Sequence, residues 1–185
     1  KFRTESGYVT TFSQELPVVS DNSELSNAFI ITNYNKLSST SDMVGKVSFY
    51  GKTITGLSDD VRISKRLNIP SSRLRGFQRG KVGPVENSDY IGGNHVSTLN
   101  FSATLPNVVQ GLDNLDVGIF VDAANVWGVD YDSSVDDKST LRSSTGVALN
   151  LMTPIGPLSF SFANALSKAS TDKTETFRFN LGTQF

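Results

Sequence analysis

The sequence lacks cysteine altogether and contains one histidine and one tryptophan among its 185 residues. Without cysteine the chain has no disulfide framework and no thiolate metal site, although this leaves the compartment open. No apolar run approaches the roughly 18 residues that a transmembrane helix needs. Lysine and arginine number 17 against 18 acidic residues, so the net charge of −1 provides no basic surface of the kind that binds nucleic acid. These absences exclude helical membrane spans and argue against nucleic-acid partners.

Short alternating segments occupy most of the chain. In about eight stretches apolar and polar residues alternate with a period of two, and no convincing amphipathic helix interrupts them. The stretches are residues 8–16, 25–34, 43–53, 96–105, 115–127, 141–152, 158–163 and 176–185. In residues 25–34 three apolar residues are adjacent, so the pattern leaves the faces of that strand unassigned. Regular strands separated by turns are typical of a β-sandwich or a β-barrel.

The composition of the two strand faces favours the barrel. A sandwich buries its apolar face and exposes the other, usually with Lys, Glu and Thr. Here the face opposite the Phe and Leu residues is often small (Gly, Ala, Ser or Asn), as expected on a crowded lumen wall. A barrel strand needs about 9–11 residues, of which alternate ones face lipid, so a mean hydropathy of −0.19 is compatible with a membrane barrel. We therefore predict an all-β, antiparallel transmembrane β-barrel.

The connection at residues 54–91 is long, basic and rich in glycine. Connections of more than about 12–15 residues are uncommon in compact domains and are usually functional. We predict that this loop folds back into the barrel lumen. An enclosed Arg75 guanidinium then needs a carboxylate partner, because an unpaired buried charge is strongly destabilising. Asp122, on the polar side of its strand, is the best-placed partner.

The residue types that could carry catalysis have simpler interpretations. A Ser-His-Asp catalytic triad would have to use His95, the single histidine, with a serine such as Ser97 or Ser102. Nothing in the sequence fixes the geometry of such a triad. A structural role at a strand end is the preferred interpretation. We predict no catalytic residue, and we expect that the protein is not an enzyme.

An acidic stretch and a set of glycines also have simpler interpretations than ligand binding. A calcium loop would require ordered spacing, a central glycine and a closing bidentate Glu, which are missing around Asp130, Asp132, Asp136 and Asp137. A solvated acidic loop is preferred, and no metal is predicted. A phosphate-binding loop would need a strand leading into a helix, which is not found around Gly76, Gly80 and Gly83. We interpret these glycines as positions of tight backbone turns at positive φ, and no cofactor is predicted.

Several short motifs occur in the same order as in a known family. They are Leu74-Arg75-Gly76-Phe77, Gly83-Pro84, Gly92-Gly93-Asn94, Val121-Asp122, Asn125-Val126-Trp127, Thr153-Pro154-Ile155-Gly156-Pro157-Leu158 and Phe177-Arg178-Phe179-Asn180-Leu181-Gly182 with Phe185. Together they span nearly the whole chain and resemble the BamA family of outer-membrane barrel assembly factors. No single motif decides the resemblance, whereas the ordered set of motifs is strong evidence for it.

The resemblance implies an architecture and a function. The family's barrel has sixteen strands, and residues 1–185 look like the C-terminal half of the barrel domain, without the first half or the periplasmic POTRA modules. Because Lys1 follows no signal peptide and the chain opens almost directly into a strand, we also expect a fragment. The implied function is assembly and insertion of β-barrel proteins into the bacterial outer membrane through a gated barrel seam. The implied partners are unfolded outer-membrane protein substrates, outer-membrane lipid and, through the missing modules, the lipoprotein subunits of the assembly complex.

The resemblance also implies a role for the long loop. In the family this loop is extracellular and enters the lumen, where acidic residues on neighbouring strands brace the arginine of its Arg-Gly-Phe motif. The corresponding latch comprises Leu74, Arg75, Gly76, Phe77, Asp122 and Asn100. Asn100 stands at the position of a second acidic residue, which removes one charge. Ser71 and Ser72 also stand where the family usually has two glycines, and Ala124 where it often has one.

The last strand corresponds to one side of the family's seam. There the first and last strands pair weakly, and incoming barrel proteins are thought to be templated by strand addition, because an unsaturated edge in lipid must find partners for its N–H and C=O groups. The seam strand and C-terminal signal correspond to Phe177, Phe179, Asn180, Gly182 and Phe185. Gly182 matches a glycine at which the strand can kink, and Phe185 the terminal aromatic by which such barrels are recognised. Simple lipid contact is the alternative role for the phenylalanines.

Two other functions stay open at this point. One is a translocation pore of the same superfamily that exports a dedicated partner and shares the Arg-Gly-Phe loop. The other is a small passive outer-membrane barrel, which would have no need of a lumen latch. With half the strands absent, we expect the edges near residues 8–16 and 175–185 to close an eight-stranded barrel or to pair with a second copy. Because eight strands enclose little more than their own side chains, closure would force the Arg75 loop out of the lumen.

Overall fold

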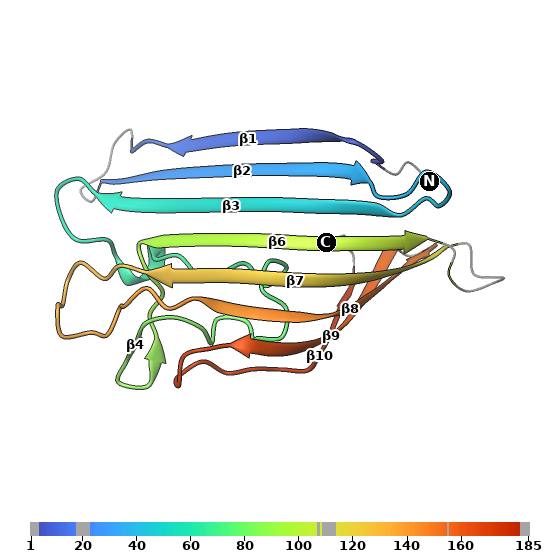
Figure 1. Ribbon diagram of the computed structural model, residues 1–185. Coiled ribbons are helices and arrows are strands. Elements are labelled where there is room, and N and C mark those ends of the chain that lie inside the picture. The colour runs from blue at the N-terminus through green and yellow to red at the C-terminus, as the bar shows by residue number, and fades with distance from the viewer. Residues whose placement is uncertain (1–3, 18–22, 107, 109–113, 155, 182–185) are drawn as a thin grey trace.

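Most of the chain forms one curved sheet. The computed structural model describes residues 4–17, 23–106, 108, 114–154 and 156–181. Within these residues eight strands pair antiparallel in the order β1-β2-β3-β6-β7-β8-β9-β10 (Figure 1). Each strand therefore lies beside the next long strand of the chain, in an up-and-down arrangement. The prediction of about eight antiparallel strands is confirmed.

The bounds of the strands follow the alternating segments of the sequence. The long strands are β1 (Gly7–Glu15), β2 (Glu24–Lys36), β3 (Val44–Gly56), β6 (His95–Pro106), β7 (Leu115–Trp127), β8 (Arg142–Thr153), β9 (Gly156–Ser167) and β10 (Phe177–Leu181). The connection from β3 to β6 carries a 3₁₀ turn, η1 (Ile63–Lys65), and a small hairpin of β4 (Val85–Glu86) and β5 (Asp89–Tyr90). Among the described residues no helix is long and apolar enough to cross a membrane.

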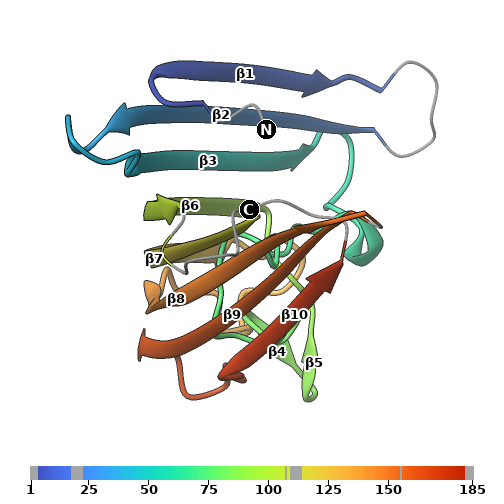
Figure 2. The same cartoon turned by 90° about the vertical axis from the view of Figure 1, so that its right-hand side faces the viewer.

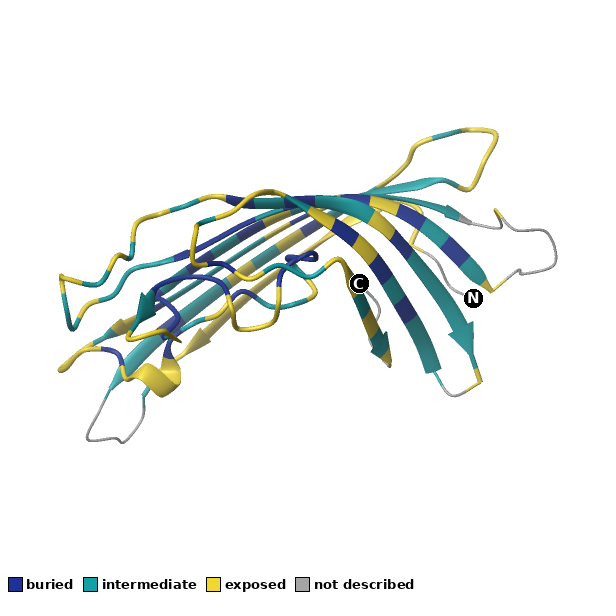
Figure 3. Cartoon of the chain, turned by 90° about the horizontal axis from the view of Figure 1, so that it is seen from below, coloured by how far each residue is buried: buried dark blue, intermediate teal, exposed yellow. Residues whose placement is uncertain are grey.

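The sheet is an open trough in which β1 and β10 form the two edges (Figure 2). β1 pairs with β2 and β10 pairs with β9, so the expected closure of eight strands onto themselves is not seen. The connection between β3 and β6 occupies the concave side (Figure 3), and a closed eight-stranded ring would have room only for its own side chains. The expected expulsion of the Arg75 loop is therefore not seen either. Pairing with a second copy stays a prediction.

The two faces of the sheet differ as the alternation predicts. Cross-strand partners share a face, and Ile31, Phe49 and Leu99 are successive partners, which assigns the faces of β2. Large apolar side chains on the convex face are exposed; they include Phe29, Ile31, Phe49, Leu99, Phe101, Ile119, Val121, Val147, Phe162, Phe177 and Phe179. Many buried residues on the concave face are small and polar, including Ser48, Thr98, Ser144, Ser159 and Ser161.

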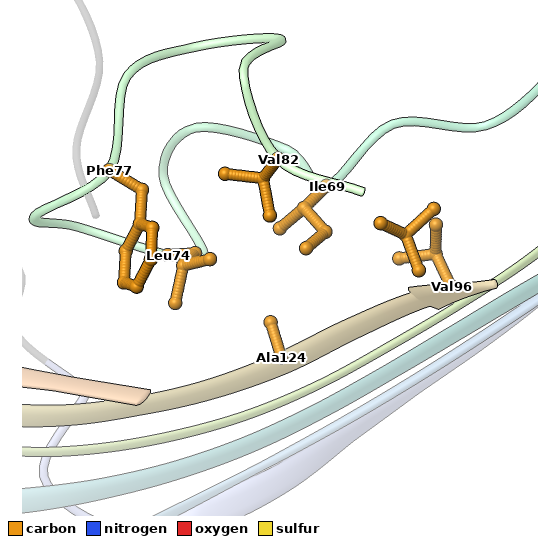
Figure 4. Close-up of a cluster of buried hydrophobic side chains, with 7 residues drawn as sticks. Ile69, Leu74, Phe77, Val82, Val96 and Ala124 are labelled. Atoms are coloured by element: carbon orange, nitrogen blue, oxygen red, sulfur yellow. The ribbon is translucent and has the colours of Figure 1, made fainter. Parts of the chain in front are cut away.

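The main hydrophobic cluster lies between the loop and the concave wall (Figure 4). The loop contributes Ile69, Leu74, Phe77 and Val82, and the wall contributes Val96 from β6 with Ala124 and Val126 from β7. This cluster fastens the loop to the sheet and contains none of the exposed phenylalanines. The convex face therefore needs a different apolar environment, which an acyl-chain layer would provide.

A lysine introduced at the middle of a strand, on the convex face, tests whether acyl chains surround that face. Val121 lies at the centre of β7 and Leu115 at its end, on the same face. In lipid vesicles Val121→Lys is expected to lower the free energy of unfolding by about 2–4 kcal/mol, and Leu115→Lys by about 0–1 kcal/mol, because the cost of a lipid-facing lysine depends on depth. Urea titration followed by the fluorescence of the single tryptophan measures both values. Equal losses at the two positions would contradict a lipid-facing convex surface.

Candidate functional site

Glycines shape the loop where its backbone approaches the wall. Gly76 has a φ of 87°, and a Cβ on it would lie 3.1 Å from the Cβ of Ala163. Gly83 has a φ of 119°, and its Cβ would lie 2.6 Å from Val126 Cγ1. Gly80 also has a positive φ, of 65°. The prediction that these glycines serve backbone turns at positive φ is confirmed, and two of them let the loop lie directly on β7 and β9.

Arg75 and Asp122 form a buried ion pair beneath the loop. Arg75 Nε donates to Asp122 Oδ2 at 2.8 Å and Nη2 donates to Oδ1 at 2.8 Å, which gives a two-point fork. The backbone N–H of Arg75 also donates to Oδ2, at 3.1 Å. Arg75 is 5% exposed and Asp122 is 0% exposed. The structure thus brings together the two residues that the sequence analysis paired.

Asn100 supports this pair from the neighbouring strand. It lies directly opposite Asp122 in the β6–β7 register. Its Nδ2 donates to Asp122 Oδ1 at 2.8 Å and to the carbonyl of Arg73 at 2.7 Å, which ties the loop backbone to the wall. Asp122 therefore accepts four hydrogen bonds, two on each oxygen, which is the full capacity of a carboxylate. The centroid of the Phe120 ring lies 3.4 Å from Arg75 Cζ, which adds a cation–π contact.

A second buried ion pair, between Arg142 and Asp172, was not identified from the sequence. Arg142 Nε donates to Asp172 Oδ2 at 2.9 Å and Nη2 donates to Oδ1 at 3.2 Å. Both residues are at most 5% exposed. Asp172 also accepts the N–H of Gly83 at 3.3 Å and that of Ala169 at 2.6 Å, so it joins the loop to the β9–β10 connection. No periodicity relates the first residue of a strand to a residue inside a distant connection.

The loop is also hydrogen-bonded to the segment that leads into β10. Phe77 and Thr174 form an isolated antiparallel bridge. The N–H of Gln78 donates to the carbonyl of Lys173 at 2.9 Å. From β10 itself, Arg178 donates to two loop carbonyls, one of them that of Phe77. The loop therefore holds the beginning of the last strand as well as the wall.

The first part of the β3–β6 loop is held to the segment that follows β7 by the pair of Arg66 and Asp130. Arg66 Nη2 donates to Asp130 Oδ1 and, at 2.9 Å, to the carbonyl of Val61, whose N–H donates to Asp130 Oδ2 at 2.9 Å. Burial alone would raise the pKa of Asp130, but hydrogen bonds from Val61, Asn94 and Arg66 outweigh it and lower the pKa below its usual value. Asp130 is therefore ionised at neutral pH and pairs with Arg66 as a full charge.

The other residues considered for chemistry have local partners. His95 Nδ1 lies 2.8 Å from Thr53 Oγ1, and the centroid of its ring lies 5.5 Å from that of Trp127. Asp132 accepts the N–H of Ser134 at 2.7 Å, in the manner of an Asx turn. Within the described ranges no group of three or more His, Asp or Glu residues is placed to hold a metal ion.

The residues assigned to the last strand divide between its two faces. Phe177 and Phe179 lie on the convex face, with ring centroids 5.1 and 5.2 Å from those of phenylalanines in β9. Asn180 lies on the opposite face, in register with Ser159. The predictions for Gly182 and Phe185 fall outside the described residues.

With this geometry established, comparison with known proteins decides the family. The family model of the Omp85 superfamily domain matches residues 1–185. The chain belongs to the Omp85 superfamily. This Omp85 chain is 32% identical over 141 residues to the outer membrane protein assembly factor BamA of Neisseria meningitidis serogroup B, covering 60% of the chain and 17% of that protein. It is 31% identical over 117 residues to the BamA of Neorickettsia risticii, covering 62% of the chain and 16% of that protein.

A solved structure has the same arrangement of strands. The crystal structure of BamA from Haemophilus ducreyi lacking POTRA domains 1–3 matches with a TM-score of 0.84 and 27% sequence identity, over 94% of this chain and 38% of that one. The resemblance to BamA proteins that the motifs indicated is confirmed. The Omp85 chain corresponds to well under half the length of each of these relatives.

Truncation of either partner of the Arg75–Asp122 pair is expected to be strongly destabilising. Arg75→Ala and Asp122→Ala should each lower the free energy of unfolding by about 3–5 kcal/mol, because each leaves a buried charge without its partner. The double variant should lose less than the sum of the two, since neither charge is then stranded. Urea titration in lipid vesicles measures the free energies of unfolding of the wild type, the two single variants and the double variant.

Arg62→Ala, which removes an exposed partner of Glu24, is the control. It should lower the free energy of unfolding by under about 1 kcal/mol. Additive losses at Arg75 and Asp122 would show that the pair is not coupled.

Proposed function

We propose that this Omp85 chain forms the C-terminal half of the barrel of an outer-membrane insertase, which assembles β-barrel proteins without chemistry, nucleotide or cofactor. The observations that carry the proposal are the curved antiparallel sheet, in which the last strand β10 has one unpaired edge among the described residues, and the inner loop that is fastened to the sheet. An edge strand presents N–H and C=O groups that must be hydrogen-bonded when water is absent. An incoming strand can satisfy them, which makes an unclosed edge a template for another barrel protein.

The convex surface supports an outer-membrane location for the proposed activity. Its exposed phenylalanines and aliphatic residues fit contact with acyl chains, whereas the buried serines, threonine and Asp122 of the concave face fit a polar lumen. Both curated relatives are named outer membrane protein assembly factors, which supports the same location and role. The proposed substrates are unfolded outer-membrane proteins. The lipoprotein subunits of an assembly complex would bind periplasmic modules outside these 185 residues.

The loop has a defined part in this proposal. Through Arg75 it is fastened to β7, and through Phe77, Gln78 and Arg178 it is fastened to the segment that begins the seam strand. Movement of β10 away from its position therefore requires these contacts to break or the loop to move with it. We propose that Leu74, Arg75, Gly76 and Phe77 act with Asp122 and Asn100 as a latch that sets the resting position of the seam.

An insertion assay tests the function itself. The protein that carries this chain is reconstituted in lipid vesicles, and a urea-unfolded outer-membrane barrel protein is added. Folding of this client, followed by its heat-modifiable mobility in gels, is expected to be faster than in empty vesicles and several-fold slower with Asp122→Asn than with wild type. Arg62→Ala should match wild type. A client folding rate equal to that of empty vesicles would contradict the insertase and would favour a dedicated exporter.

A reversible cross-link tests whether the loop must part from the seam segment. Gln78 and Lys173 are exposed cross-strand neighbours beside the Phe77–Thr174 bridge, and the chain has no cysteine of its own. Gln78→Cys combined with Lys173→Cys is expected to slow client folding when oxidised and to restore it when reduced. Each single-cysteine variant controls for the substitutions. An oxidised double variant with full activity would show that the loop and the seam segment stay together during insertion.

A further inference from the structure

A polar cavity lies beside the Arg75–Asp122 pair, and the proposed function assigns no ligand to it. It has a volume of about 230 Å³ and opens on the concave face between the loop and strands β2, β3, β6, β7 and β8. Hydroxyl and amide side chains make up much of its lining. Three cationic side chains also line it, namely Lys46, Arg73 and Arg75.

Lys46 and Arg73 are not paired with a carboxylate among the residues that the structure describes. Arg73 Nη1 donates to Ser48 Oγ at 3.3 Å, and its guanidinium carbon lies 4.8 Å from the centroid of the Tyr50 ring. Lys46 Nζ lies 6.0 Å from the centroid of the Tyr34 ring. These contacts use one N–H of Arg73 and leave most of the donors of both side chains for another acceptor.

The acidic residues nearby do not neutralise this charge. Asp122 already accepts four hydrogen bonds, three from Arg75 and one from Asn100. Asp116, the next acidic residue on the concave face of β7, lies opposite Asn150 and does not line the cavity. The lining itself contains no acidic residue, and of its three cations Arg75 alone forms an ion pair with a carboxylate, that of Asp122, among the residues that the structure describes. The mutual repulsion of the other two cations is strengthened where the loop and the wall exclude part of the water.

We propose that this cavity binds a small oxyanion of the phosphate or carboxylate class. Lys46 and Arg73 provide charged donors, and the hydroxyls of Ser48 and Ser102 are further hydrogen-bonding groups in the lining. The volume is below the roughly 300–1,000 Å³ of pockets for drug-sized ligands, so it suits a small anion with its bridging water. The bound anion connects Lys46 on the wall to Arg73 in the loop. The backbone carbonyl of Arg73 already accepts a hydrogen bond from Asn100 of the wall.

Titration with inorganic phosphate tests the site. Isothermal titration calorimetry is performed on the protein in detergent micelles, with chloride keeping the ionic strength constant. Saturable binding is expected, and Lys46→Gln and Arg73→Gln should each weaken it by about tenfold or more, because one charge-assisted hydrogen bond contributes at that level. Lys138→Gln removes the same charge in the exposed β7–β8 connection and should leave the affinity unchanged. An absence of saturable binding to the wild-type protein would overturn the proposal.

A variant that supplies its own anion gives an independent test. Ser102 is the cross-strand partner of Lys46, so Ser102→Asp places a carboxylate opposite that ammonium. This variant is expected to abolish phosphate binding and to raise Tm in phosphate-free buffer, whereas Ser102→Asn should retain binding. Competition by glutarate would extend the ligand class to carboxylates, and a failure to compete would restrict it to phosphate. Unchanged phosphate affinity in Ser102→Asp would overturn the proposal even if the Lys46 and Arg73 variants failed to fold.

Discussion

The burial of one arginine determines how the loop and the wall fit together. A guanidinium taken out of water is tolerated only when a carboxylate and hydrogen bonds replace its hydration. Asp122 meets this requirement with three hydrogen bonds from Arg75 and one from Asn100. Because side chains alternate along a strand, a carboxylate on the concave face commits Val121 to the convex face. A slip of one residue in β7 would reverse both, so this polar contact helps to specify the register of the sheet.

Two apolar environments are separated by the thickness of one sheet. On the concave side Leu74 and Phe77 of the loop are 2% exposed, and they pack against Ala124 of the wall. On the convex side Phe101 and Phe177 are 44% and 51% exposed. The first environment is made by the chain itself, and the second has to be provided by the surroundings. A membrane provides it, which is why a chain of modest mean hydropathy carries a phenylalanine-rich outer surface.

Local patterns in the sequence predicted the strands, and an argument about charge predicted the Arg75–Asp122 contact. Both depend on short-range rules, namely alternation within a strand and the need of a buried cation for an anion. The pairing of Arg142 with Asp172 was missed because it depends on how the β9–β10 connection folds over the loop, which no periodicity records. Closure of the eight strands was expected because bare strand edges need partners, with the Arg75 loop forced out of the lumen. The structure shows neither, because the loop stays packed against the concave wall through Leu74 and Phe77 and occupies the space that a closed ring of eight strands would need.

The loop also has a mechanical consequence for the shape of the wall. A strongly twisted sheet of few strands tends to curl into a narrow cylinder, and the diameter of a barrel is coupled to its strand number and tilt. The packed loop, which is fastened to the inside of the sheet by Arg75, Arg142 and Arg178, opposes that curling. The radius of curvature is then set from within, by the thickness of the packed loop, as well as by the pairing of neighbouring strands.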